Sequence, residues 1–491
     1  MELVLALDAG TSGVRAVAFD AQARVRDSSY LELTQHFPRP GEVEHDAQEI
    51  AALAVATLRD VAARARANGD DVVALGITNQ RETTVAFDRA TGQLPHRAIV
   101  WQDRRTASYC DELDARGETP TVRSTTGLVL DAYFSASKMR WFLDHAHMDQ
   151  LRAPSFATVD SWLLWWLTGG VENGVFATEP SNASRTMLMD LDTARWSAPM
   201  TALFDVDPAM LAAIQPSLST FGTVSADVIP ELAGVPITGI LGDQQSALFG
   251  QACFRPGVVK ATYGTGAFIL ANVGEKNPGV FDGLITTLAW DLGDGASRTY
   301  AVEGSAFVAG AAVQWLRDEL GFVDDSSQLE ALATSVNDSA GVQFVAAFTG
   351  LGSPFWRSDA RGSITGLSRG VGRGQIARAL IESLAYQVRA MTDAFRDGGI
   401  ALHELRADGG AAAMDLLMQL QASNSRLAVL RSTSLEATAR GAATIAGLGA
   451  GLWRSLEELN DLWTFDRRFE PEDPLFVDLG YAAWRRALEH A

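Results

Sequence analysis

A short Gly-Thr loop next to apolar strands occurs twice in the chain, once near the N-terminus and once past the midpoint. The first loop spans residues 8–13 (Asp-Ala-Gly-Thr-Ser-Gly) and follows the apolar run 3–7, and the second spans residues 263–266 (Tyr-Gly-Thr-Gly) before the apolar run 268–270. Glycine allows such a turn to adopt positive φ and to bring backbone N–H groups close to an anion, and threonine adds a hydroxyl donor. One such loop usually only reverses a hairpin. Two of them, one in each half, predict two similar lobes that hold the phosphates of a nucleotide between them.

Length, charge and cysteine usage narrow the class of protein. The 491 residues exceed what one compact core holds, so two large domains are expected. The net charge of −20 argues against nucleic acid and against an anionic membrane surface as partners. Cys110 and Cys253 lie far apart in unrelated contexts, and Glu2 precedes the first apolar run, which therefore favours a first strand over a signal peptide. These features predict a soluble protein of the reducing cytoplasm.

The first half alternates strand and helix patterns. Asp46 and Glu49 have the spacing of a capping box that begins a helix. The near-continuous apolar run 72–77 predicts a strand buried on both faces, and the runs 83–87 and 98–101 predict a hairpin. The first half is therefore predicted to be an α/β domain with polar segments at its strand ends, where open sheets place their ligands.

The second half repeats this theme. Apolar residues at helical spacing over 376–391 predict a helix that ends before Gly398. A strand is predicted over 402–407, followed by the Gly409-Gly410 turn and a helix that begins at Ala411. A glycine turn that opens a helix gathers free N–H donors and the positive end of the helix dipole at one point.

The two halves are predicted to be separate domains that meet across a cleft. The boundary is expected within residues 245–256, which assigns residues 1–250 to an N-terminal domain and residues 251–491 to a C-terminal domain. No low-complexity linker separates them, so the lobes are expected to face each other directly. The apolar run 162–167 is too short to cross a bilayer and predicts a buried helix.

Three polar segments could line the cleft. They are residues 79–82 (Asn-Gln-Arg-Glu), 101–103 (Trp-Gln-Asp) and 243–245 (Asp-Gln-Gln). Together they offer a guanidinium, carboxylates, amides and an indole face, a mixture that suits a small polyhydroxylated molecule because each hydroxyl both donates and accepts. Each segment also has an ordinary structural interpretation, as an exposed ion pair, a core tryptophan or a helix cap. Spacing alone therefore predicts a cleft and leaves its occupant open.

Longer motifs resemble a known family. Similarity to the FGGY carbohydrate kinases extends from about residue 3 to about residue 485 and is carried by the first loop and by the runs 76–83, 98–102, 131–135, 178–187, 242–245 and 346–352. The Asn-Gln-Arg-Glu-Thr run at 79–83 and the Gly-Asp-Gln-Gln run at 242–245 are its most specific parts. The resemblance implies an α/β fold of two ribonuclease H-like (actin-like ATPase) domains with ATP in the cleft. Within the family, the motifs are most similar to those of members that act on glycerol.

The resemblance implies roles for individual residues. Glycerol contacts are implied for Arg81, Glu82, Trp101, Tyr133, Asp243, Gln244 and Phe268. Nucleotide contacts are implied for Thr11, Ser12, Gly13, Arg15, Thr265, Gly310, Gln314, Gly410 and Met414. Mg²⁺ is implied as the cofactor, held near Asp8 and Asp243 through water, because Mg²⁺ keeps much of its hydration shell.

The implied reaction is ATP-dependent phosphorylation of glycerol to sn-glycerol 3-phosphate with Asp243 as general base. Positioning of the hydroxyl in line contributes about 7–11 kcal/mol, more than the ~10²–10⁴-fold that a base supplies, so Arg81 and Glu82 are expected to matter as orienting groups. One alternative is a kinase of the same family for another small polyol or ketose, such as dihydroxyacetone, erythritol or a pentitol. Another is a catalytically silent regulatory paralogue that binds a nucleotide or polyol.

The chain departs from the family pattern at three places. Gly13 and Val14 replace hydroxyl-bearing residues of the first loop, and Met414 and Asp415 replace an Asn-Asn pair that helps to hold adenine. The segment 227–235 lacks the Gly-Gly-Thr-Arg loop through which some bacterial members bind fructose 1,6-bisphosphate, so that regulation is not expected. The resemblance also implies a homo-oligomer, a dimer or a tetramer.

Overall fold

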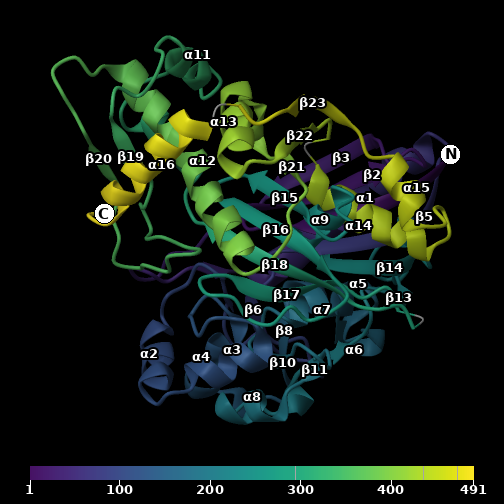
Figure 1. The fold of residues 1–491 in the computed structure, drawn as a ribbon. Coiled ribbons are helices and arrows are strands. Elements are labelled where there is room, and N and C mark those ends of the chain that lie inside the picture. Colours follow the sequence, from purple (N-terminus) through teal and green to yellow (C-terminus); the bar gives the residue numbers. More distant parts are fainter. Residues whose placement is uncertain (294, 435, 473) are drawn as a thin grey trace.

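The computed structural model describes residues 1–491 except 294, 435 and 473, and two large sheets form its centre (Figure 1). The first sheet has the strand order β13-β14-β5-β1-β2-β3. Its strands are β1 (Glu2–Ala9), β2 (Gly13–Phe19), β3 (Val25–Glu32), β5 (Asp71–Asn79), β13 (Leu218–Thr223) and β14 (Pro236–Gly242).

Three strands of the first sheet end at one edge. β1 and β2 form the predicted antiparallel hairpin around the first Gly-Thr loop, and β5 and β14 run parallel to β1. Asp8 therefore lies beside Thr78 in the register of the sheet, and Thr78 lies beside Leu241. Because the carboxyl ends of parallel strands meet at the same edge, the segments that follow β5 and β14 are neighbours there.

The second sheet repeats this arrangement. Its order is β17-β18-β16-β15-β21-β22-β23, with β15 and β16 as an antiparallel hairpin around the second Gly-Thr loop and with β21 and β22 parallel to β15. The predicted duplication of a hairpin with a Gly-Thr loop is thus confirmed. The strands are β15 (Val258–Tyr263), β16 (Ala267–Gly274), β17 (Ile285–Trp290), β18 (Thr299–Ala306), β21 (Glu404–Asp408), β22 (Ala428–Ser432) and β23 (Phe465–Phe469).

Helix α1 (Ala47–Ala67) covers the outer face of the first sheet with Ile50 and Leu58 in its core. The predicted capping box is only half formed. The Asp46 carboxylate accepts hydrogen bonds from the backbone N–H groups of the first turn, but the Glu49 side chain accepts from Thr34. Thr34, which lies two residues after β3, offers Glu49 both its backbone N–H and its hydroxyl.

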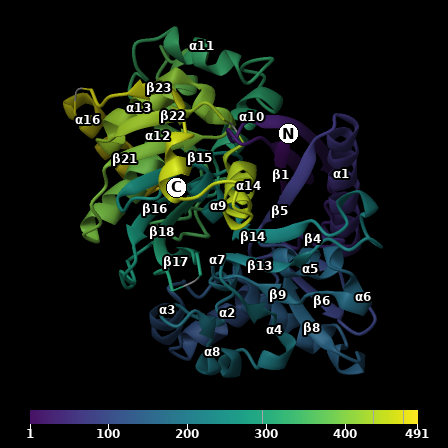
Figure 2. The ribbon, with the colours of Figure 1, turned by 90° about the vertical axis from the view of Figure 1, so that its right-hand side faces the viewer.

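Two helices fill the space between the sheets. α9 (Asp243–Gly250) and α14 (Ala437–Gly449) lie in one core cluster with residues of both sheets, and Figure 2 shows α14 between them. The approach is close: a Cβ atom added at Gly76 of β5 would lie 2.0 Å from the carbonyl oxygen of Ala442. A helix from the end of the chain therefore packs directly on the first sheet. The division at residue 250 stays a prediction.

The helix pattern of the second half is partly as predicted. α12 (Arg373–Asp397) confirms the predicted helix, and α5 (Val159–Leu167) confirms the buried helix of the first half. The prediction of a helix from Ala411 is wrong, because Gly410–Ala413 form a 3₁₀ turn and α13 (Asp415–Ser425) begins only after it. Met414 interrupts the helix: its backbone is extended and its side chain is buried in the core of the second sheet.

Smaller elements complete the fold. A four-stranded sheet contains the predicted hairpin and consists of β4 (Glu44–His45), β6 (Thr84–Asp88), β7 (Ala98–Ile99) and β8 (Pro154–Thr158). Short strands are β9 (Ala177–Thr178), β10 (Met189–Asp190), β11 (Arg195–Trp196), β12 (Ala213–Ile214), β19 (Gln343–Val345) and β20 (Ser363–Thr365). Further helices are α2 (Ala107–Ala115), α3 (Thr119–Thr126), α4 (Ser135–His145), α6 (Gly170–Asn173), α7 (Pro180–Ala183), α8 (Ala198–Leu203), α10 (Gly310–Asp318), α11 (Gln328–Thr334), α15 (Leu456–Asp461) and α16 (Pro474–Leu488). Within the described residues, no helix combines the length and the apolar character that a membrane crossing requires.

Candidate active site

The centre of the site lies where β5 and β14 end. Arg81 and Glu82 follow β5, and Asp243 follows β14 as the first residue of α9. The Nε atom of Arg81 lies 3.1 Å from Oδ1 of Asp243. The sheet topology thus brings together two residues that the sequence only paired by resemblance.

Asp243 is held through one of its two oxygens. Its Oδ1 forms an ion pair with Arg81 Nε and accepts a hydrogen bond from the backbone N–H of Gln244 at 2.7 Å. Burial raises the pKa of Asp243, and the charge of Arg81 opposes that rise. The Asp243 side chain is 29% exposed whereas that of Arg81 is 2% exposed, so the carboxylate is the part of the pair that a substrate can reach.

Aromatic side chains join this centre to the first Gly-Thr loop. The rings of Trp101 and Tyr133 meet edge to face with centroids 5.6 Å apart, and the Tyr133 hydroxyl lies 3.5 Å from Nη2 of Arg81. Trp101 Nε1 donates to Oγ1 of Thr11 at 2.8 Å. A predicted substrate residue is therefore in direct contact with a predicted nucleotide residue.

The second sheet contributes the opposite wall. Phe268 lies on β16, half-buried and opposite Thr262. Gln244 is held by Lys260, whose Nζ donates to Oε1 of Gln244. The fully buried Lys260 has a pKa lowered to about 8 by burial, against the pull of Asp408 and Asp243. The predicted glycerol residues thus come from both sheets.

Glycine serves the two loops differently from what the sequence predicts. The expected positive φ is not found at the loop glycines, which are Gly10, Gly13, Gly264 and Gly266. That expectation is therefore wrong. Close approach explains Gly13 and Gly266. A Cβ atom at Gly13 would lie 2.4 Å from the ring of Tyr30, and one at Gly266 would lie 2.5 Å from the carbonyl oxygen of Ala306.

Three of the predicted nucleotide residues of the second half lie at or near the second loop. The N–H of Gly310 donates to Gly264 O at 2.9 Å, and the N–H of Ala309 donates to Thr265 O at 2.8 Å. Gly409, which does adopt positive φ, lies so close that a Cβ atom there would be 2.6 Å from the carbonyl oxygen of Tyr263. Thr265, Gly310 and Gly410 are therefore neighbours. Gln314 lies exposed further along α10, whereas Met414 points into the core.

The first loop contacts the second half through Arg15. Arg15 lies opposite Asp8 in the β1–β2 register and forms an ion pair with Glu436, the residue that precedes α14. Ser12 receives a hydrogen bond from Tyr30 through its carbonyl oxygen at 3.3 Å. The loop is thus tied to the helix between the sheets, a contact that the sequence did not indicate.

Asp8 and Asp243 are close enough for their charges to interact. Burial, together with the negative charge of Asp243, raises the pKa of Asp8 to about 7. Within the described residues, no group of three or more His, Cys, Asp or Glu side chains is arranged as a metal cage. Two mutually repelling carboxylates without a cage fit a hydrated Mg²⁺, which takes most of its ligands from water and substrate phosphates.

Two charged residues beside Arg81 were missed by the sequence-based prediction of the site. Glu303 of β18 places Oε2 2.5 Å from Arg81 Nη1, and Arg185 places Nη2 3.0 Å from Glu303 Oε1. The nearby charges of Arg185 and Arg81 lower the pKa of Glu303 to about 2, although burial alone would raise it. A lone carboxylate inside the otherwise uncharged strand 299–306 is the sequence signal that could have indicated Glu303.

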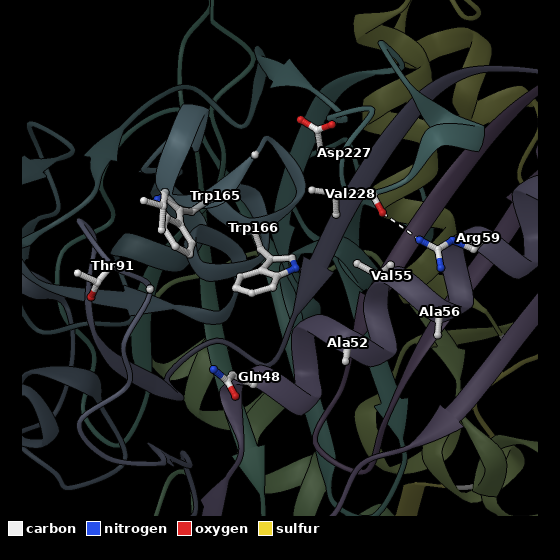
Figure 3. A pocket seen from close by; sticks show the side chains of 14 residues that line it. Gln48, Ala52, Val55, Ala56, Arg59, Thr91, Trp165, Trp166, Asp227 and Val228 are labelled. Atoms are coloured by element: carbon white, nitrogen blue, oxygen red, sulfur yellow. Dashed lines mark hydrogen bonds between the residues drawn. The ribbon is translucent and has the colours of Figure 1, made fainter.

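A separate pocket of about 610 Å³ lies on the outer side of the first sheet (Figure 3). Trp165 and Trp166 of α5 face α1 across it, and Arg59 of α1 donates to the carbonyl oxygen of Val228 at 3.0 Å. The predicted site residues are absent from its lining. The pocket is therefore separate from the candidate site.

Comparison with known proteins agrees with this geometry. Residues 3–250 match the N-terminal domain of the FGGY family of carbohydrate kinases, and residues 259–450 match its C-terminal domain. The chain belongs to this family, and its fold is the predicted pair of ribonuclease H-like (actin-like ATPase) domains.

Individual relatives are similar over their full length. A glycerol kinase from Albidiferax ferrireducens is 51% identical over 480 residues, which cover 96% of this chain and 95% of that protein. A glycerol kinase from Rhodopirellula baltica is 48% identical over 498 residues, covering 100% of this chain and 91% of that protein. The crystal structure of Plasmodium falciparum glycerol kinase with ADP superposes with a TM-score of 0.93 at 34% identity, covering 100% of this chain and 98% of that one. A xylulose kinase from Brucella ovis, at 22% identity and a TM-score of 0.88, shares the fold.

Proposed function

We propose that the chain is an ATP-dependent glycerol kinase that produces sn-glycerol 3-phosphate. Similarity to glycerol kinases at 51% and 48% identity over nearly the whole chain supports this proposal. The single observation that carries it is the contact of Arg81 with Asp243, 3.1 Å apart, beside the Trp101–Thr11 hydrogen bond. A polyol at the carboxylate is then adjacent to the loop that receives the phosphates.

The walls of the site suit a three-carbon substrate. Trp101 and Phe268 offer apolar faces for the C–H side of glycerol, and Arg81, Glu82 and Gln244 offer polar groups for its hydroxyls. Lys260 holds the Gln244 side chain by a hydrogen bond, and Gly242 precedes the helix that begins at Asp243. A sugar ring would need smaller side chains than Trp101 and Phe268.

Asp243 is the proposed general base. Its Oδ1 is engaged by Arg81 and by the Gln244 N–H, while its Oδ2 has no hydrogen-bond partner within the described part of the chain and is free to accept the hydroxyl proton. As the new O–P bond forms and the bond to ADP breaks, the proton passes to this oxygen. A carboxylate is basic enough because phosphoryl transfer proceeds through a loose transition state.

The two loops and a metal ion are proposed to manage the phosphate charge. Thr11 and Ser12 act from the first loop with Arg15 of β2, and Thr265 acts from the second loop with Gly310 at the start of α10. Mg²⁺ supplies charge neutralisation at the phosphate oxygens, and Asp8 and Asp243 would hold it through water. To contact the nucleotide, the Arg15 side chain must first release its ion pair with Glu436.

We also infer a cytoplasmic location, where ATP is available. Both cysteines, Cys110 and Cys253, are free and buried, which agrees with a reducing compartment. Assembly as a dimer or tetramer stays a prediction.

An assay of ADP release tests the proposal. The purified protein is given ATP and Mg²⁺ with glycerol, dihydroxyacetone, erythritol, ribitol or xylulose in parallel. We expect kcat/KM for glycerol to exceed that for each larger polyol by at least about tenfold, the effect of one misplaced group in a packed pocket. Turnover only with one of the other substrates would support kinase activity and refute glycerol as the substrate. The absence of turnover with every polyol would favour the silent paralogue.

A further inference from the structure

Arg81 belongs to a buried network of charged side chains. It consists of Arg81, Glu82 and Arg185 from the first half of the chain and Glu303 from the second, and each side chain is at most 2% exposed. Such a set is costly to desolvate and is stable only when every charge is paired, so its geometry is tightly constrained.

Glu303 enters this network from the opposite sheet. It lies opposite Leu270 of β16, two positions from the pair Phe268–Ser305, so Glu303 and Phe268 lie on the same face of the second sheet. That face is directed toward the first half, because the carboxylate reaches two arginines there. The network therefore joins the second sheet to Arg81 and Arg185 of the first half.

Arg81 makes its hydrogen bonds through its two terminal nitrogens, and its Nε forms an ion pair with Asp243. Glu303 receives two of them, from Nη1 at 2.5 Å and from Nη2 at 3.2 Å, and Gln245 receives another from Nη1 at 3.2 Å. Nε is directed at Asp243. Because a guanidinium is planar, the two contacts to one carboxylate fix its plane and hence the direction of Nε.

Arg185 fixes the carboxylates in turn. Its Nε donates to Glu82 Oε1 at 2.7 Å and its Nη2 donates to Glu303 Oε1 at 3.0 Å. Its guanidinium lies over the rings of Tyr133 and Phe134, with centroid distances of 5.7 and 5.2 Å. Without Glu303, the buried guanidinium groups of Arg81 and Arg185 would share, within this network, the single carboxylate of Glu82.

We infer that Glu303 is a positioning residue for the polyol site. Its carboxylate holds the Arg81 guanidinium in the plane that directs Nε to Asp243, and Arg185 holds Glu303 and Glu82 in register. The inference rests on the proposed function for the identity of the polyol. Because Arg81 of the network contacts Asp243 and Tyr133, both predicted to bind the polyol, loss of the network should weaken polyol capture and leave nucleotide binding unchanged.

Kinetics of Glu303→Gln test this inference. The control is Glu404→Gln, which removes a carboxylate of the same sheet that pairs with buried Arg406 at 2.8 Å outside the site. We expect the glycerol KM of Glu303→Gln to rise at least about tenfold, since an orienting group displaced by about 1 Å can cost ~10²-fold. The ATP KM should stay within about twofold, and the control should change neither constant by more than that. A glycerol KM within twofold of wild type, or an equal rise in the control, would overturn the inference.

A second variant and a structural measurement separate the positioning role of Glu303 from misfolding of the variant and from an error in the proposed substrate. Arg185→Lys keeps the charge but cannot bridge Glu82 and Glu303, so it should raise the glycerol KM by about threefold or more. Crystal structures of both variants should have the Arg81 guanidinium turned away from Asp243, beyond hydrogen-bond distance. An unmoved Arg81 refutes the positioning role even if the polyol is not glycerol, whereas a wild-type enzyme inactive on glycerol refutes only the proposed function.

Discussion

At the scale of single residues, Asp243 has two oxygens in different surroundings. Arg81 Nε and the Gln244 N–H both bind Oδ1, so an amide in place of the carboxylate can keep these contacts through its own oxygen. The role of a base and the role of a binding group can therefore be separated at this position.

Asp243→Asn should lower kcat by at least about 10²-fold, the low end for loss of a general base, and change the glycerol KM by less than about threefold. Asp291→Asn is the control, because Asp291 also contacts an arginine Nε (Arg298, 3.0 Å) and a backbone N–H (Gly293, 2.9 Å) but lies outside the candidate site. Steady-state kinetics of the three proteins decide the point. Comparable kcat values for Asp243→Asn and the control would remove Asp243 from the base role.

At the scale of elements, the two Gly-Thr loops resemble each other in sequence but differ in what surrounds their glycines. The neighbour of Gly13 is the ring of Tyr30, a 45% exposed side chain that can move, whereas the neighbour of Gly266 is the backbone of Ala306 at the end of β18. A methyl group at Gly266 must therefore displace a strand.

Gly266→Ala should lower the free energy of unfolding by about 1–3 kcal/mol, the usual range for overpacking, and Gly13→Ala should lower it by less than about 1 kcal/mol. Urea denaturation at constant pH measures both. Equal losses in the two variants would contradict the distinction between a mobile ring and a fixed backbone.

Local patterns in the sequence predicted the elements but not how they meet. Apolar spacing and turn residues predicted the two Gly-Thr hairpins, strand β5 and helix α12. These patterns are properties of neighbours in the chain. The predicted helix start at Ala411 was wrong because Met414 has an extended backbone and a side chain buried in the core. The predicted capping box formed only in part because the Glu49 carboxylate accepts from Thr34. These are tertiary effects that a local pattern does not contain.

The candidate site divides in the same way. Arg81 and Asp243 could be paired from their motifs, and the parallel strands then place them together. Glu303 and Arg185 lie in segments whose meeting depends on how the two sheets face each other. A charged residue within an apolar strand was the one available signal.

At the scale of the whole molecule, Glu303 is a link between the two halves, and its contribution should depend on pH. Its pKa is lowered from 4.5 to about 2 in the folded state, so its ionised form favours folding. That stability is fully present above the unfolded pKa near 4.5 and is lost as pH falls toward 2.

Wild type should therefore exceed Glu303→Gln in unfolding free energy by about 3–5 kcal/mol at pH 7, the usual effect of breaking a buried ion pair. The difference should begin to shrink below pH 4.5. Urea unfolding at pH 7, 5 and 4 measures it. A difference that stays constant, or grows as the solution is acidified, would contradict the ion-pair role.

The central claim is that the cleft transfers phosphate to glycerol and not to water. Phosphorus NMR of the wild-type protein with ATP, Mg²⁺ and glycerol follows the fate of the γ-phosphoryl group directly. The account predicts that sn-glycerol 3-phosphate accumulates in step with ADP, with inorganic phosphate at no more than a few per cent of it, since a closed site excludes water. Inorganic phosphate as the main product, or ATP left unchanged, would contradict it.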